Sequence, residues 1–215
     1  MRALYWNIRD VRKAAAKLAL RIFIKEKHLE VVCIAKPMVE ITIKVDWGQI
    51  NPLLTFVHAK CLRVLRRDLW TELGTVAPLD SCPWLVVRDF NATLALTEKK
   101  GPGSFSQGSI AEFGAMVDAC SLMAIPSQER KFTWTNNRKV GHVAAVLDRS
   151  FCNEAWLSVL GDSSQIVLTS TISDHPPILV VAEAIKRPAN APFRFQRFWL
   201  DHPNFPSVVE DSWKE

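Results

Sequence analysis

Short apolar stretches, separated by polar and charged segments, run through the first 185 residues of the chain. Stretches rich in Val, Ile, Leu and Phe, or alternating apolar with polar positions, predict β-strands. The predicted strands cover residues 3–8, 30–35, 53–59, 83–91, 131–136, 142–152, 164–170 and 178–185. Strands that are separated by a few helices of mixed length are typical of an α+β or α/β layered domain.

The longest predicted helix covers residues 10–28, where Ala14, Leu18 and Ile22 repeat every four residues. Basic residues repeat at the same spacing along another face of this helix, at Arg9, Lys13, Lys17, Arg21 and Lys25. Shorter helices are predicted at residues 65–74, about 110–121 and 153–161. Ser109 and Glu112 suit a capping box at the start of the second of these.

Length and composition indicate one globular domain with a tail. The chain has 215 residues, of which 48% are hydrophobic and 23% are charged. No apolar run approaches the roughly 18 residues that cross a bilayer, and the first ten residues contain no apolar signal-peptide core. We therefore expect an intracellular protein. Its five scattered cysteines form no C-x-x-C pair, so we expect reduced and mostly buried thiols.

Positive charge is concentrated in the front of the chain. Residues 1–67 contain 14 Lys and Arg against 5 Asp and Glu, a net charge of +9, whereas the whole chain carries +5. A basic surface suits a polyanion such as nucleic acid. A solvated basic face without a partner gives the same pattern, so charge alone leaves both readings open.

The composition changes near residue 186. The stretch KRPANAP (186–192) is typical of a linker, and residues 193–215 are aromatic and charged. We therefore predict one domain over residues 1–185 and a connector segment over residues 186–215.

Polar residues gather at the ends of the predicted strands. They are Asn7, His58, Asp89, Asn91, Asp148, Asp174 and His175. A single Asp or His at such a place is more often a turn or structural residue. As a set they suggest hydrolysis of a phosphodiester, because carboxylates and amides are ligands for Mg²⁺ and a His beside an Asp suits general-base chemistry.

The order of these motifs resembles the endonuclease/exonuclease/phosphatase superfamily, and most closely the endonuclease domain of plant LINE-type, non-LTR retrotransposons. The matching stretches are YWNIRD (5–10), VCIAKPMV (32–39), FVHAKC (56–61), PWLVVRDFNATLALTEKKG (83–101), FTWTNNR (132–138), VLDRSFCNEAW (146–156) and SDHPPIL (173–179). The tail FRFQRFWLDHPNF resembles the connector that such elements place before a reverse transcriptase.

This resemblance implies a four-layered DNase I-like sandwich, with two mixed sheets between helices and the site at one edge. It implies Mg²⁺ or Mn²⁺ as cofactor, with Asn7 and Asp174 among the groups that hold the metal. The implied substrate is DNA, and an intact element would work in the nucleus beside a reverse transcriptase domain. Arg9, Lys13 and Asn136 are the expected nucleic-acid contacts.

The resemblance also implies catalytic roles. Asp89 and Asn91 would position the nucleophilic water and steady the scissile phosphate. His175 would act as general base or as phosphate-stabilising acid, and Asp148 would hold the histidine side of the site in place. His58 stands where the family usually has a tyrosine that donates to the phosphate, a role that an imidazole can also fill.

Three departures from the family pattern oppose activity. Lys36 stands where the family has a metal-binding glutamate, which reverses the charge at that position. The stretch from Pro37 to His58 is short, so part of the first sheet is expected to be missing, with one strand formed by residues 39–45. Arg88 replaces the small residue expected before Asp89 and must find solvent or a partner.

Three interpretations follow from the sequence. The first is a Mg²⁺-dependent DNA endonuclease that nicks a target strand. The second is an inactive retrotransposon remnant that at most binds nucleic acid. The third is a superfamily member acting on phosphoinositides or sphingomyelin, which FTWTNNR and the tail disfavour.

Overall fold

The sheet that contains the N-terminal strand is mixed and is called the first sheet below. In the computed structural model its strands lie in the order β2 (Val31–Ile34), β1 (Arg2–Trp6), β13 (Ile178–Glu183), β12 (Asp162–Val167) and β8 (Ser127–Gln128). β2 runs parallel to β1, while β13 runs antiparallel to it. The structure describes residues 1–8, 11–34, 40–47, 49–78, 81–103, 106–128, 130–169, 172–183 and 205–212.

The second sheet is also mixed. Its strands lie in the order β3 (Glu40–Lys44), β4 (Leu53–His58), β5 (Trp84–Asp89), β11 (Asp148–Cys152) and β7 (Met123–Ala124). A smaller antiparallel sheet contains β6 (Lys99–Lys100), β10 (Ala144–Ala145) and β9 (Trp134–Thr135), and the short 3-10 helix η1 (Leu96–Glu98) precedes it.

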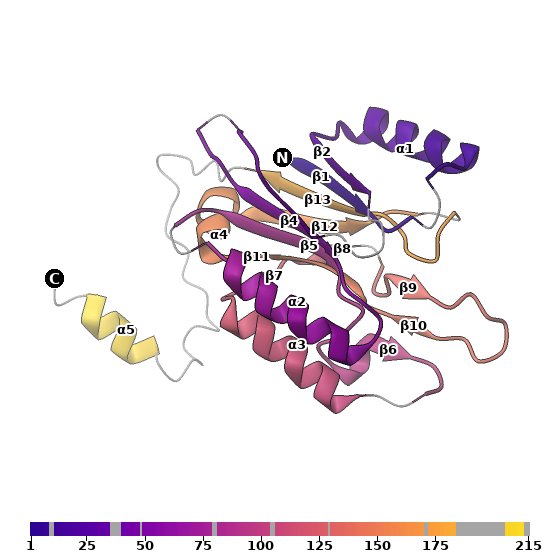
Figure 1. Cartoon of the computed structure of the whole chain (residues 1–215). Coiled ribbons are helices and arrows are strands. Elements are labelled where there is room, and N and C mark those ends of the chain that lie inside the picture. The colour runs from indigo at the N-terminus through magenta and orange to yellow at the C-terminus, as the bar shows by residue number, and fades with distance from the viewer. Residues whose placement is uncertain are drawn as a thin grey trace. The chain divides into compact units, whose positions relative to one another are not determined.

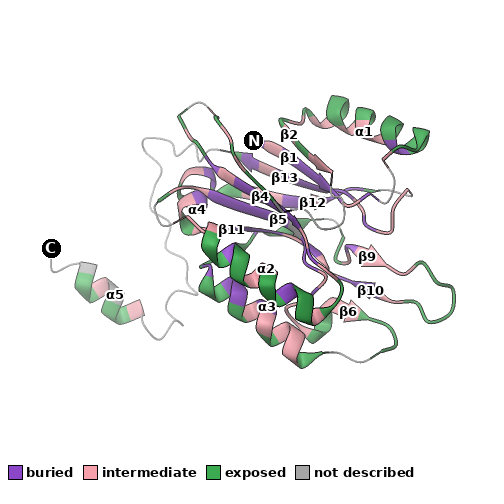
Figure 2. Ribbon diagram, viewed as in Figure 1, coloured by how far each residue is buried: buried purple, intermediate pink, exposed green. Residues whose placement is uncertain are grey.

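The main core lies between the two large sheets (Figure 1). Because side chains alternate along a strand, Tyr5 points into this core, while Leu4 and Trp6 belong to clusters on the other face of the first sheet. Helix α4 (Glu154–Leu160) adds the buried Trp156 to the same core. The central strands are accordingly buried along most of their length (Figure 2).

Helices cover the outer face of each sheet and complete four layers (Figure 1). Helix α1 (Ala14–Lys27) packs Ala16 and Phe23 against the first sheet, where the Phe23 and Trp6 rings meet edge to face at 5.7 Å. Helices α2 (Arg63–Val76) and α3 (Gln107–Ala119) cover the second sheet. Phe113 of α3 lies 4.7 Å from Phe90 between ring centroids, in a cluster of aromatic side chains.

The structure corrects several sequence expectations. The repeat of Leu18 and Ile22 lies on the exposed side of α1, with exposed fractions of 60% and 42%. The predicted strand 131–136 is only two residues long, and the predicted strand 142–152 divides into β10 and β11 in different sheets. Helix α3 is capped by Ser106, whose hydroxyl accepts from the Ser109 amide, so the expected Ser109–Glu112 capping box is absent.

The five cysteines are free thiols, as expected, but only two of them are fully buried. Cys120 and Cys152 are buried, Cys33 and Cys82 are half-buried, and Cys61 is exposed. The cysteines therefore bridge no part of the fold, and its stability depends on packing and hydrogen bonding.

The short stretch between Pro37 and His58 forms β3, the single strand predicted for it, beside β4. Both strands belong to the second sheet, so the stretch that was expected to be part of the first sheet contributes to the other one. Lys36 lies outside the described residues, as does the side chain of Arg88. The backbone of β5 continues through Arg88 and keeps its register with β4 and β11.

The chain divides into two compact units, Met1–Ile185 and Lys186–Glu215. Within the second unit, residues Phe205–Ser212 form helix α5. Its identification as a connector toward a reverse transcriptase stays a prediction. In the described part of the chain, no helix has both the length and the apolar character needed to span a bilayer.

Candidate active site

Three strand ends of the second sheet meet at one edge of the sandwich. The parallel strands β4 and β5 end at His58 and Asp89, which are register partners. The antiparallel strand β11 begins at Asp148, the partner of Asp89 on the other side. The strand pairing therefore places one histidine and two carboxylates side by side.

The first sheet brings its own polar ends to the same edge. β1 ends just before Asn7, and β13 runs back from Ile178, so the segment that precedes β13 lies beside the end of β1. Two hydrogen bonds fix this segment: the Trp6 indole donates to the His175 carbonyl at 3.1 Å, and the Ser173 hydroxyl donates to the Asn7 carbonyl at 2.9 Å.

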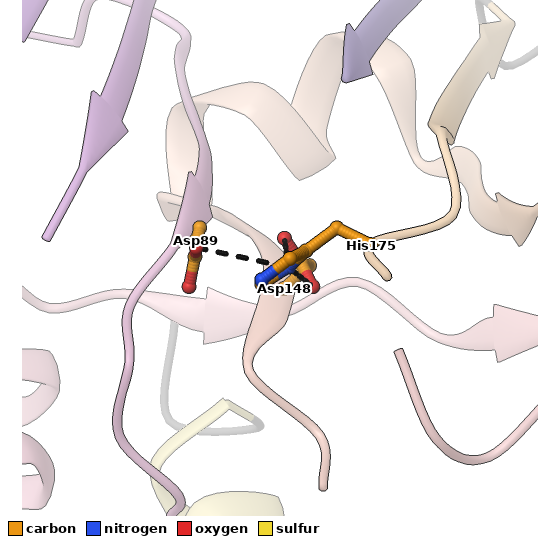
Figure 3. Close-up of side chains that lie close together, drawn as sticks. All are labelled: Asp89, Asp148 and His175. Atoms are coloured by element: carbon orange, nitrogen blue, oxygen red, sulfur yellow. Dashed lines mark hydrogen bonds and ion pairs between the residues drawn. The ribbon is translucent and has the colours of Figure 1, made fainter. Parts of the chain in front are cut away.

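Asp89, Asp148 and His175 form the centre of the site (Figure 3). The His175 Nδ1 atom lies 2.9 Å from Asp148 Oδ2 and 3.7 Å from Asp89 Oδ2. Asp89 is 0% exposed and Asp148 is 1% exposed. One ligand atom from each of the three residues lies within 4.8 Å of the others.

Burial and the neighbouring carboxylate act together on Asp89. Burial disfavours its charged form, and the charge of Asp148 adds repulsion, so the pKa of Asp89 rises to about 7. His175 and hydrogen bonds from Asn91 and Asn7 oppose this rise only in part. Burial and the charge of Asp148 thus make the Asp89 carboxylate harder to ionise.

His175 responds in the opposite direction. Burial alone would lower its pKa, but attraction to Asp148, their hydrogen bond and the charges of Asp89 and Asp174 outweigh burial and raise the pKa to about 9. His175 is therefore protonated at neutral pH, and its Nδ1–H donates to Asp148.

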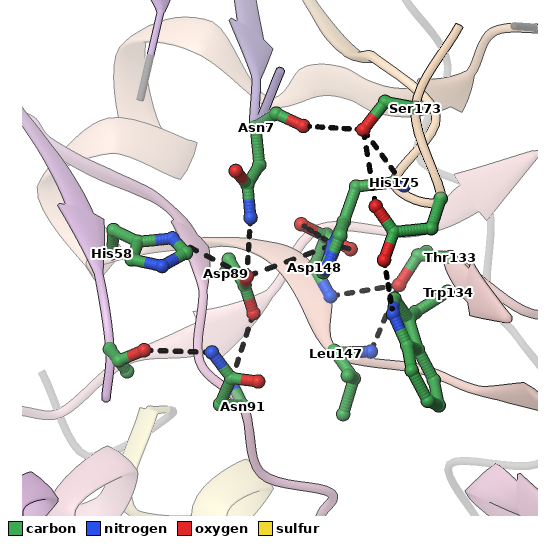
Figure 4. A network of polar contacts seen from close by, with 12 residues as sticks. Asn7, His58, Asp89, Asn91, Thr133, Trp134, Leu147, Asp148, Ser173 and His175 are labelled. Carbon is green, nitrogen blue, oxygen red and sulfur yellow. Dashed lines mark hydrogen bonds and ion pairs between the residues drawn. The ribbon is translucent and has the colours of Figure 1, made fainter. Parts of the chain in front are cut away.

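Asn7 and His58 approach Asp89 from two different sheets (Figure 4). The Asn7 Nδ2 donates to Asp89 Oδ2 at 2.8 Å, while its amide oxygen points away from the carboxylate. The His58 Nδ1 lies 3.4 Å from the same oxygen. His58 thus contacts Asp89, the residue predicted to position water.

The structure adds Tyr5 and Thr133, which the sequence reasoning missed. The Tyr5 hydroxyl donates to the Val57 carbonyl at 3.1 Å and accepts from the Asp89 amide at 3.4 Å. Burial raises the pKa of Tyr5 well above its usual value. The Thr133 hydroxyl accepts from the Asp148 amide at 2.8 Å. Strand alternation points Tyr5 inward, which was the one available signal for it.

Asp174 and Trp134 lie on the side of the site that faces the small sheet. The Trp134 indole donates to Asp174 Oδ2 at 3.1 Å, and the Ser173 hydroxyl lies 3.4 Å from Asp174 Oδ1. The centroids of the Trp134 and His175 rings are 6.5 Å apart. Trp134, which was not among the predicted site residues, thus orients the carboxylate next to His175.

Two of the three expected nucleic-acid contacts, Lys13 and Asn136, lie among the described residues. Lys13 is exposed and precedes α1, in the connection that leaves the end of β1. The Asn136 amide organises the β9–β10 loop by donating to the Gly141 carbonyl at 2.9 Å and accepting from the Val143 amide at 3.0 Å. Arg9 lies outside the described residues. Their roles in binding stay predictions.

The residues present fit a divalent cation. Two buried carboxylates, Asp89 and Asp148, converge, and a cation beside Asp89 would favour its ionised form against burial and the charge of Asp148. Carboxylate and amide oxygens are the ligands that Mg²⁺ takes in proteins. Of the two metal ligands predicted from sequence, Asn7 donates to Asp89 through its Nδ2, and Asp174 accepts a hydrogen bond from Trp134. Their roles as ligands stay predictions.

No family model matches the sequence, and no curated protein matches it. Solved structures do match. The endonuclease domain of TRAS1, a telomere-specific non-LTR retrotransposon, has a TM-score of 0.66 at 14% identity, with 86% of this chain and 99% of that chain covered. An AP endonuclease from Archaeoglobus fulgidus has a TM-score of 0.59 at 10% identity, with coverages of 86% and 100%. The 3′ phosphatase NExo from Neisseria, solved with a product DNA hairpin, has a TM-score of 0.57 at 11% identity, with coverages of 85% and 99%.

These likenesses establish the fold. The two facing mixed sheets with helices outside them are the DNase I-like sandwich, which confirms the fold expected from the sequence motifs. At identities of 10–14%, the likeness extends to the architecture and leaves the activity to be argued from the site.

Proposed function

We propose that this chain hydrolyses phosphodiester bonds in DNA with a divalent metal ion, as an endonuclease of the LINE type. The observation that supports this most is the convergence of Asp89, Asp148 and His175, from three separate elements, at one edge of a DNase I-like sandwich. Burying two carboxylates and a protonated imidazole lowers the stability of a fold, and ionisable groups with shifted pKa values cluster at functional sites.

His175 and Asp148 act as a pair. Because His175 is protonated at neutral pH and its Nδ1 faces Asp148, its Nε2–H is the group that donates to a phosphate oxygen. Asp148 keeps the ring charged and oriented, and Thr133 in turn holds the Asp148 backbone. His175 therefore stabilises negative charge on the phosphate as it develops.

Asp89 and Asn91 act on the attacking water and on the phosphate, respectively. Asp89 accepts hydrogen bonds from Asn7 and from the Asn91 backbone, which leave its carboxylate oriented at the strand end. Asp89, when ionised, orients the water, and the Asn91 amide contacts the phosphate. Mg²⁺ held by Asp89, whose carboxylate Asn7 orients through its Nδ2, would neutralise phosphate charge and lower the pKa of the water.

The test is the nicking of supercoiled plasmid in Mg²⁺. We expect the natural chain to convert supercoiled to open-circular DNA, and His175→Asn to reduce the rate about a hundredfold or more. His28→Asn is the matched control, because His28 is exposed at the C-terminal end of α1, away from the strand ends that form the site. Equal rates for both variants would contradict the assignment.

The second candidate is an inactive remnant, and Lys36 is the observation that favours it. Lys36→Glu restores the acidic residue that the resemblance implies. If only this variant nicks DNA, the scaffold is sound and a single residue has silenced it. If neither chain nicks while both remain folded, the remnant reading holds.

A further inference from the structure

Asn91 is held at both ends of its amide by one short loop. Its Nδ2 donates to the Ala59 carbonyl at 2.7 Å, and the Cys61 thiol donates to its Oδ1 at 3.8 Å. Since a carbonyl only accepts and a thiol donates, these two contacts determine which end of the amide faces which way. One N–H of the Asn91 Nδ2 and one lone pair of its Oδ1 therefore remain available to a substrate.

The backbone of Asn91 is equally constrained. It has a φ of 46°, in the left-handed region that Asn tolerates better than most residues, and its amide donates to Asp89 Oδ1 at 3.0 Å. The side chain therefore leaves the end of β5 in a direction that only this local structure provides. Its final orientation depends on the loop of Ala59, Lys60 and Cys61.

The loop is in turn held by Arg66, a buried residue of α2 that is 5% exposed. The Arg66 Nη1 donates to the Cys61 carbonyl at 2.7 Å and to the Lys60 carbonyl at 3.3 Å. Its Nη2 donates to the Ser109 hydroxyl at 2.7 Å, near the start of α3. One planar guanidinium thus joins two helices to the loop.

Asn91 and Ser109 border a cavity. A cavity of about 250 Å³ is lined by Asn91, Ser109, Lys99 and Trp134, among others. Arg66 donates a hydrogen bond to Ser109 directly, and it supports Asn91 indirectly, because Asn91 donates to the loop that Arg66 holds. A shift of the Arg66 side chain would therefore change the orientation of the Asn91 amide.

We propose that Arg66 is a positioning residue for the nuclease site: its buried guanidinium fixes the Ala59–Cys61 loop, and this loop sets the orientation of the Asn91 amide. The catalytic consequence rests on the proposed function. The structural consequence, that Asn91 loses its orientation without Arg66, can be measured in a chain that cuts nothing.

The experiment compares Arg66→Gln with Arg67→Gln. Arg67 follows Arg66 in the same helix but is exposed and bonds Glu112, so it is the matched control. The first readout is the side-chain NH₂ pair of Asn91 in a ¹⁵N–¹H spectrum, identified by its loss in Asn91→Asp. We expect Arg66→Gln to shift this pair and to speed its solvent exchange roughly tenfold, as for one lost hydrogen bond. Arg67→Gln should do neither.

The second readout is the nicking reaction. Arg66→Gln should lower kcat about tenfold to a hundredfold at nearly unchanged KM, since misplacing a group costs rate more than binding.

Should Arg66→Gln not fold, Cys61→Ala replaces it, with Cys61→Ser, which keeps a donor, restoring the NH₂ pair. An unmoved Asn91 pair in the folded variant overturns the proposal, as does a raised KM at unchanged kcat. A chain that nicks nothing but shows the shifted pair refutes the proposed function and supports the positioning role.

Discussion

At the scale of single residues, the charge on His175 depends chiefly on its neighbours. Burial opposes the protonated ring, and Asp148 overcomes burial from 2.9 Å away. Burial raises the pKa of Asp89, and the charge of Asp148 raises it further. Asp148 thus keeps His175 protonated, and its charge also makes Asp89, in the adjacent strand, harder to ionise.

Replacing Asp148 tests this division. In Asp148→Asn, we expect the pKa of His175 to fall from about 9, because burial is then opposed by fewer charges. A histidine whose folded pKa is raised stabilises the fold below about pH 6.5 and loses that contribution as the pH rises through about 9. The natural chain should therefore lose stability over this range more steeply than Asp148→Asn.

The measurement is an NMR titration of the His175 ring, together with urea unfolding at several pH values. Asp118→Asn, on the exposed side of α3, is the matched control and should leave both curves unchanged. A His175 titration that is the same in Asp148→Asn and in the natural chain would show that Asp148 does not set its charge.

Individual site residues differed in how far the sequence revealed them. Asp89, Asn91, Asp148 and His175 were predictable because each stands at the end of an apolar strand, in an ordered motif. Thr133 and Trp134 were not, because their roles depend on the β9–β10 hairpin folding over the start of β11, a contact that no local pattern encodes. Arg66 was similarly hidden in a helix rich in arginine.

At the scale of elements, α1 shows how periodicity can predict a helix and leave its buried side undecided. Ala14, Leu18 and Ile22 form one apolar stripe, and Ala16, Leu20 and Phe23 form another about halfway around the helix. Both satisfy helical spacing. The first sheet selects the second stripe, since Ala16 is 0% exposed against Trp6 and Ile8.

This selection can be tested with one substitution at two neighbouring positions. Ala16→Leu adds volume to a closed contact and should cost about 1–3 kcal/mol of unfolding free energy. Ala15→Leu, on the exposed side, should change it by no more than about 0.5 kcal/mol. Urea unfolding of both variants gives the two values. Comparable losses in both would mean that α1 buries a different face.

Helix caps depend on single hydrogen bonds, and these too were only partly predictable. Ser109 and Glu112 have capping-box spacing, but Glu112 instead binds Arg63 and Arg67 of α2 at 2.7–2.9 Å. These contacts hold the pKa of Glu112 down to about 2. An ion pair between helices displaced the local motif, and Ser106 took the cap one turn earlier.

At the scale of the whole molecule, the site lies at an edge that both sheets share, and its buried charge bears on the stability of the entire fold. Asp89 has a folded pKa of about 7 against an ordinary 3.8. An acid whose pKa is raised favours the fold at low pH, and this contribution is lost as the pH rises through about 7. The metal-free chain should therefore weaken on going from pH 5 to pH 8.

A divalent cation should reverse much of this loss, because it binds the ionised carboxylate in the folded chain only. With free Mg²⁺ at roughly ten times its dissociation constant, linkage predicts about 1.4 kcal/mol of stabilisation. The effect should be larger at pH 8 than at pH 5, where protons compete for Asp89. Thermal unfolding in Mg²⁺ and in EDTA, at matched ionic strength, measures it.

Asp89→Asn should be more stable than the natural chain in EDTA at pH 8 and should gain nothing from Mg²⁺. If Mg²⁺ raises the melting temperature of Asp89→Asn as much as that of the natural chain, the ion binds elsewhere, and the carboxylates at the sheet edge are not its site.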